Sequence, residues 1–111
     1  MIKAGGVMAN QDKFTILDVR TQEEWDGVHI NTAIHIPLDD LESRYTEIPK
    51  GKVVVCVCRS GGRSAMATEF LVSKGIEARN LEGGMVIWTQ TELDKGFIDD
   101  DEFHKRIKEI K

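Results

Sequence analysis

The cysteine at position 58 is the residue of this sequence best placed to do chemistry. It ends an apolar run in the segment VVVCVCRSGGRS (residues 53–64), with Arg59 next to it and Arg63 after four intervening residues. A free thiol is mostly protonated at pH 7, and the thiolate is the nucleophile. Nearby cations and the unpaired N–H groups of a following helix favour the anion. The pattern therefore predicts a nucleophilic Cys58 thiolate.

The residues after Cys58 are suited to holding an anion. Ser60, Gly61 and Gly62 allow the backbone to turn tightly and to point several N–H groups inward. Together with Arg63, such a loop would bind an oxyanion such as a sulfonate, a sulfite or a phosphate, or an adduct formed on the sulfur. No histidine lies near Cys58 in the sequence, so the thiolate would have to form without an adjacent base.

An α/β domain with a mainly parallel sheet is predicted to position this loop. Short β-branched or apolar runs predict four strands, at residues 13–19, 33–37, 52–57 and 76–81. Helical segments separate them, as in strand–helix–strand units. Residues 52–57 carry four valines without alternation of polarity, which favours a central strand buried on both faces. Ligands bind beyond the carboxyl ends of such strands, where Cys58 lies.

Two helices have clear local signals. Thr21 and Glu24 have the spacing of a capping box, so a short helix is predicted to begin there and to end at Gly27. The helix after Cys58 is predicted over residues 63–75, with Gly75 at its end. Its apolar stripe is expected to consist of Ala65, Met66, Phe70 and Leu71.

Composition and cysteine usage exclude several classes of protein. The chain of 111 residues is the length of one domain, and its net charge of −4 argues against a nucleic-acid surface. Two cysteines form no disulfide framework, and reduced thiols favour a cytoplasmic protein. The first ten residues contain no apolar run long enough for a signal peptide or a membrane span. Cys56 lies among valines and is expected to be a core residue. No cofactor is predicted, and a Cys-x-Cys pair alone is a poor metal site.

The end of the chain is predicted to form a tail, residues 95–111, after a main domain at residues 1–94. Phe103, Ile107 and Ile110 have helical spacing. Acidic residues precede this amphipathic helix and basic residues close it, as the helix dipole favours. We expect the tail to dock on its own domain, and docking to a partner is the alternative.

Four segments in order resemble the single-domain rhodanese (thiosulfate sulfurtransferase-like) family. They read LDVRTQEEW, HINTAIHIPL, VVVCVCRSGGRS and LEGGMVIW, and they run from about residue 14 to residue 88. The resemblance implies a rhodanese-like α/β fold with a central, mainly parallel five-stranded sheet flanked by helices. It also implies a sulfurtransferase that carries a sulfane sulfur as a persulfide on its cysteine.

The resemblance implies roles for the Cys58 loop, by which we mean residues 58–63. Cys58 matches the catalytic cysteine, and the loop amides match the cradle that holds the persulfide. Asp18 and Arg20 match positions that are usually structural. The predicted substrate-binding residues are Arg59, Ser60, Gly61, Gly62, Arg63 and Ser64. Of these, the two arginines would engage the anionic donor.

Two positions depart from the family pattern. Val28 and Thr32 stand where glycine is usual, and the loss of glycine can change backbone dihedrals in that loop. His29 matches a family position and is expected to be structural.

The predicted function is transfer of sulfur from a small anionic donor such as thiosulfate to a thiol or protein acceptor. One alternative is a non-catalytic rhodanese-like binding module that docks a partner through the tail helix. Another is a phosphatase or arsenate reductase of the same fold. Phosphatases with a Cys-loop-Arg cradle have five residues between the two side chains, whereas four separate Cys58 from Arg63. The shorter loop favours a sulfur atom over a phosphoryl group.

Overall fold

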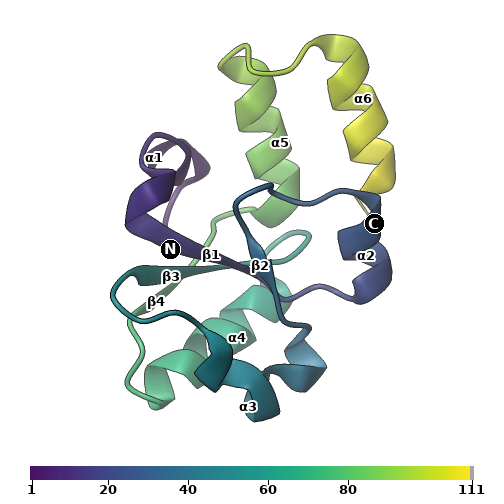
Figure 1. Cartoon of the computed structure of the whole chain (residues 1–111). Helices are drawn as coiled ribbons and strands as arrows, with labels where there is room; N and C mark the ends of the chain where they lie inside the picture. Colours follow the sequence, from purple (N-terminus) through teal and green to yellow (C-terminus); the bar gives the residue numbers. More distant parts are fainter. Residues whose placement is uncertain (111) are drawn as a thin grey trace.

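Four parallel strands form one sheet in this computed structural model, which describes residues 1–110. They are β1 (Phe14–Asp18), β2 (Ile34–His35), β3 (Val53–Val57) and β4 (Ala78–Asn80), in the spatial order β2-β1-β3-β4 (Figure 1). The register places Asp18 beside His35 and Val57, and Cys56 beside Asn80. The carboxyl ends of the strands therefore meet at one edge of the sheet.

The sheet has four strands among the described residues, so the prediction of five is wrong. The place of a fifth strand, beside β4, is taken by a single β-bridge between Ile2 and Leu81. The Ile2 amide donates to the Asn80 carbonyl at 3.0 Å, and the Ile2 carbonyl accepts from the Glu82 amide at 2.8 Å. Helix α1 (Ala4–Met8) begins soon after Ile2. The chain therefore leaves the sheet before the pairing can extend.

Helices cover both faces of the sheet (Figure 1). On one face lie α3 (Leu41–Arg44) and α4 (Gly62–Ser73), and on the other lie α1, α5 (Gly84–Asp94) and α6 (Asp100–Glu109). Helix α2 (Gln22–Gly27) follows β1. Three short 3-10 helices complete the elements: η1 (Gln11–Lys13), η2 (Leu38–Asp40) and η3 (Tyr45–Glu47). Within residues 1–110, every helix is too short or too polar to reach across a bilayer.

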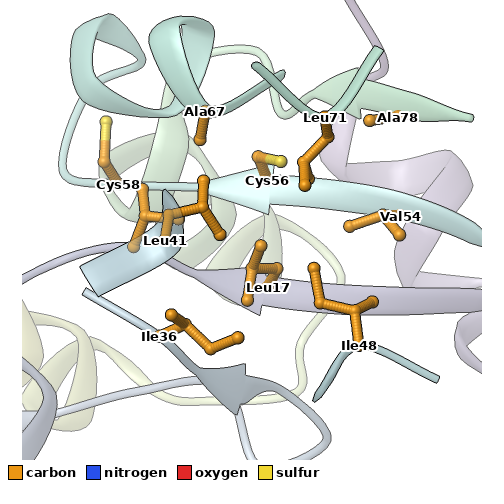
Figure 2. Packing of buried hydrophobic residues seen from close by; sticks show 11 residues of the cluster. Leu17, Ile36, Leu41, Ile48, Val54, Cys56, Cys58, Ala67, Leu71 and Ala78 are labelled. Carbon is orange, nitrogen blue, oxygen red and sulfur yellow. The ribbon is translucent and has the colours of Figure 1, made fainter. Parts of the chain in front are cut away.

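Strand β3 contributes side chains to two hydrophobic cores. Val54 and Cys56 belong to the core beneath α3 and α4, which Figure 2 shows. Val55 and Val57 belong to the core beneath α1 and α5. Successive side chains of a strand point to opposite faces, so burial of both faces explains the valine run without alternation. The prediction of a doubly buried central strand is confirmed.

The buried face of α4 differs from the predicted stripe. Met66 is 61% exposed, whereas Ser64, Ala67 and Leu71 are buried. Intervals of three and four residues place these three side chains on one face of the helix. The prediction is therefore wrong for Met66 and right for Leu71.

Helix α6 lies against α5 and closes the second core. Ile110 is buried in the cluster that contains Trp88. Arg106 on α6 pairs with Glu92 on α5 at 3.1 Å. Asp99 caps the first turn of α6, because its carboxylate accepts from the Glu102 amide at 2.8 Å.

Candidate active site

Cys58 follows β3 directly and lies inside the turn made by its own loop. Its sulfur accepts a hydrogen bond from the Gly61 amide at 3.1 Å and lies 3.3 Å from the Ser64 hydroxyl. Gly61 has a φ of 123°, which residues with a side chain rarely adopt, and this conformation lets the loop fold back over the sulfur. Figure 2 shows the sulfur pointing toward the first turns of α4.

The surroundings of Cys58 favour its anionic form. Burial of the residue, which is 2% exposed, raises the pKa of the thiol. Hydrogen bonds from the Ser64 hydroxyl and from the amides of Ser64, Gly61 and Ser60 lower it, and the net pKa lies below the ordinary value. Of the loop amides that were predicted to hold an anion, those of Ser60 and Gly61 therefore contribute to this lowering of the pKa.

Cys56 has the opposite character, although its side chain belongs to the same hydrophobic core as that of Cys58. It is fully buried, and burial raises the pKa of its thiol to about 11. Figure 2 places it over β3, between Ala67 and Leu71. Its predicted role as a core residue is confirmed.

Arg63 lies in the loop, but its guanidinium holds the carboxylate of Glu24 on α2. Nη1 and Nη2 lie 2.6 and 2.9 Å from the two carboxylate oxygens. Glu24 also accepts from the Thr21 amide at 3.1 Å, which confirms the predicted capping box. Hydrogen bonding by Arg63 lowers the pKa of Glu24 from 4.5 to about 2. Because an arginine has five N–H donors, three of those on Arg63 remain for an anion.

The other predicted loop residues differ in exposure. Arg59, Ser60 and Gly62 are exposed, Gly61 is half-buried, and Ser64 is fully buried. The loop therefore presents one exposed cation, Arg59, to solvent beside a buried sulfur.

The start of α5 holds the backbone of Cys58 and Arg59. The Met85 amide donates to the Cys58 carbonyl at 2.9 Å, and the Val86 amide donates to the Arg59 carbonyl at 3.2 Å. Gly84 has a φ of 57°, and a Cβ atom there would overlap both carbonyl oxygens. The Gly-Gly pair is visible in the segment LEGGMVIW, but the contact that makes glycine necessary at position 84 is seen only in the folded chain.

Asn80, at the end of β4, also contacts the loop and was missed from the sequence. Its Nδ2 donates to the Gly61 carbonyl at 3.1 Å, and its Oδ1 accepts from the Ser64 hydroxyl at 2.6 Å. The available signal was a polar residue at the carboxyl end of a strand, at the same edge of the sheet as Cys58.

Asp18 and Arg20 form the predicted structural pair. Both are fully buried, and Nη2 of Arg20 lies 2.8 Å from Asp18 and donates to the Val28 carbonyl at 2.6 Å. Val28 has an extended backbone with φ of −154°, and no residue with a side chain has a positive φ within residues 1–110. Glycine is therefore required at neither Val28 nor Thr32.

Two histidines stack on Trp25 and have structural roles. The ring of His29 lies 3.6 Å from that of Trp25, and the ring of His35 lies 4.7 Å from it. His29 Nδ1 donates to the Trp25 carbonyl, and His35 Nε2 donates to the Arg20 carbonyl, each at 2.7 Å. The expected structural role of His29 is confirmed. Among the described residues, no three His, Cys, Asp or Glu side chains gather to hold a metal ion.

Two grooves lie away from the Cys58 loop. One, of about 650 Å³, is lined by residues 26–32, α5 and α6. The other, of about 660 Å³, is lined by residues 45–54 and 74–77, and begins near the amino end of β3. Neither contains a nucleophilic side chain comparable to Cys58, so the chemistry of the chain points to the loop.

Comparison with known proteins agrees with the geometry. A family model described as Rhodanese-like domain matches residues 5–91. A putative sulfurtransferase of Bacillus subtilis, YtwF, is 35% identical over 77 residues, covering 69% of this chain and 75% of the relative. The crystal structure of a rhodanese-related protein from Thermoplasma volcanium superposes with a TM-score of 0.77 at 32% identity, covering 81% of this chain and 90% of that one.

Some relatives are longer than this chain. A putative sulfur carrier protein of Bacillus subtilis, YrkF, is 36% identical over 81 residues, which is 72% of this chain but 44% of the relative. The chain thus spans less than half the length of that protein.

Proposed function

This chain belongs to the rhodanese-like family, and on that premise we propose that it moves a sulfane sulfur from an anionic donor such as thiosulfate to a thiophilic acceptor through a persulfide on Cys58. The observation that carries the proposal is the sulfur of Cys58 within hydrogen-bonding distance of the Gly61 amide and the Ser64 hydroxyl. Two relatives, one named a putative sulfurtransferase and the other a putative sulfur carrier protein, also support the proposal.

The proposed reaction has two displacements. The Cys58 thiolate attacks the outer sulfur of thiosulfate, the S–S bond of the donor breaks, and sulfite leaves with the electron pair. An acceptor thiolate then attacks the outer sulfur of the Cys58 persulfide and restores the Cys58 thiolate. A covalent intermediate of this kind gives ping-pong kinetics.

The loop supplies charge stabilisation for both steps. The amides of Ser60, Gly61 and Ser64 favour negative charge on the sulfur of Cys58, and donors arranged in advance stabilise charge without reorganisation. Arg59, which is exposed, and the unused N–H groups of Arg63 would attract the sulfonate end of the donor.

The spacing of the loop disfavours phosphoryl transfer, because four residues separate Cys58 from Arg63 where phosphatases with a Cys-loop-Arg cradle have five.

The test is sulfur uptake followed by intact mass. We expect the wild-type chain to gain the mass of one sulfur atom after thiosulfate, and to lose it to cyanide. Cys58→Ser should do neither, whereas Cys56→Ala, the matched control, should still load sulfur. Absence of a sulfur adduct on the wild type, or sulfur on Cys58→Ser, would overturn the proposal.

A further inference from the structure

The Ser64 hydroxyl has one proton and three acceptors within reach. Its oxygen lies 2.6 Å from Asn80 Oδ1, 3.2 Å from the Gly61 carbonyl and 3.3 Å from the Cys58 sulfur. A serine hydroxyl donates only one hydrogen bond at a time. The three acceptors therefore compete for this proton, and the shortest of the three contacts is the one to Asn80 Oδ1.

The orientation of the Asn80 amide is fixed by its second contact. Nδ2 faces the Gly61 carbonyl at 3.1 Å, and a carbonyl oxygen can only accept. Oδ1 must therefore face Ser64 and accept from it. The backbone of Asn80 is held by the pairing of β4 with β3, where it lies beside Cys56.

The protonation of Cys58 decides what Ser64 can do. When Cys58 is a thiol, its S–H can donate to Ser64 while Ser64 donates to Asn80. When Cys58 is a thiolate, the sulfur also accepts, and it competes with Asn80 Oδ1 for the one Ser64 proton.

We propose that Asn80 is a positioning residue of this site, which holds the Ser64 hydroxyl proton away from the Cys58 sulfur and so keeps the sulfur reactive. A thiolate that receives more hydrogen bonds is more stable and a weaker nucleophile, since nucleophilicity falls as the pKa falls. Asn80 limits that stabilisation and also anchors the Gly61 carbonyl of the loop. The inference rests on the proposed role of Cys58, but its test needs no sulfur transfer.

The charged groups around Cys58 are unaffected by the substitutions needed. They include Arg63, which interacts with Cys58 and with Asp18 and is paired with Glu24 on α2, and Asp18 is in turn paired with Arg20. Asn80 and Ser64 are neutral, so a change in the titration of Cys58 reports hydrogen bonding rather than net charge.

The test is a double-mutant cycle on the titration of Cys58, followed by the ultraviolet absorbance of its thiolate. Ser64→Ala should move the midpoint up by less than about one pH unit, because the anion loses a donor whose proton it shares with Asn80. Asn80→Ala should move it down by up to about one pH unit, because the Ser64 proton is freed for the sulfur. Cys56, with a pKa of about 11, ionises at higher pH and does not interfere.

The sign of the midpoint shift caused by Asn80→Ala, and its dependence on Ser64, distinguish the proposal from simple loosening of the loop. In the Ser64→Ala background, Asn80→Ala should no longer lower the midpoint. Equal shifts in both backgrounds, or an upward shift with Ser64 present, would overturn the proposal. If Asn80→Ala does not fold, Asn80→Leu removes the same acceptor while keeping the side-chain shape. Ser73→Ala, a neutral substitution of an exposed serine at the far end of α4, is the control and should leave the midpoint unchanged.

Discussion

The ion pair between Arg63 and Glu24 allows the contribution of charge to stability to be separated from the contribution of helix capping. The Glu24 carboxylate takes part in both, because it accepts from Arg63 and from the Thr21 amide. Glu24→Gln removes the charge but keeps an oxygen for the cap, since glutamine also completes a capping box. Any loss of stability in this variant therefore reports the ion pair.

The expected magnitude follows from the pKa of Glu24. A fall from 4.5 to about 2 corresponds to at most about 3.4 kcal/mol at pH 7, taking about 1.36 kcal/mol per pH unit. The Arg63 side chain is 37% exposed, so solvent screening reduces this value. We expect Glu24→Gln to lower the free energy of unfolding by about 1–2 kcal/mol at pH 7.

The pH dependence has a definite sign. Because the pKa of Glu24 is lower in the folded chain, the unfolded chain binds more protons between about pH 2 and 4.5. The contribution of the pair is therefore complete above pH 4.5 and is lost as the pH falls toward about 2. The difference between wild type and Glu24→Gln should shrink to less than half at pH 3.

Urea unfolding at pH 7 and pH 3, followed by tryptophan fluorescence, measures this difference. Glu23→Gln is the matched control, because Glu23 is exposed in the same first turn of α2 and its loss changes the net charge and the helix-dipole interaction equally. If both variants lose the same stability, or if the loss from Glu24→Gln does not change with pH, the ion pair does not stabilise the chain and the reasoning fails.

Three further predictions concern the loop and the core. Gly84→Ala should lower the free energy of unfolding by more than about 3 kcal/mol and raise the pKa of Cys58, as measured by unfolding and by thiol titration. Gly96→Ala, whose Cβ would meet nothing within 4 Å, should lower the free energy of unfolding by about 1 kcal/mol, and equal losses in the two variants would contradict the importance of the Gly84 contact. Arg63→Ala should raise the KM for thiosulfate severalfold, and an unchanged KM would remove Arg63 from donor binding. Ile110→Ala should lower the free energy of unfolding by about 2 kcal/mol, because Ile110 is buried, whereas Met66→Ala should change it little, because Met66 is exposed. Equal effects of the two substitutions would show that the buried end of the tail does not stabilise the core.

Local sequence signals predicted the parts of the site that lie close together in the chain. The change from valines to Cys58, the glycines after it and the spacing of Thr21 and Glu24 each depend on a few neighbouring residues. The strand end, the capping box and the core position of Cys56 were therefore predictable.

Contacts between distant segments were not predictable in the same way. Arg63 and Glu24 are 39 positions apart, and Asn80 lies 16 positions from Ser64. The direction of each side chain depends on how the strands pair and how the helices rotate. The Met66 error has the same origin, because the buried face of α4 is set by its angle to the sheet.

The Cys56 thiol can serve as an internal probe of how often the core of the native chain opens. Cys56 is fully buried in the core beneath α4, and its backbone pairs with β1 and β4 on either side. A thiol reagent can reach it only when that core opens. Once Cys58 has been blocked, the ratio of the labelling rate of Cys56 in buffer to its rate in denaturant gives the equilibrium constant for opening of the central strand, with no engineered reporter.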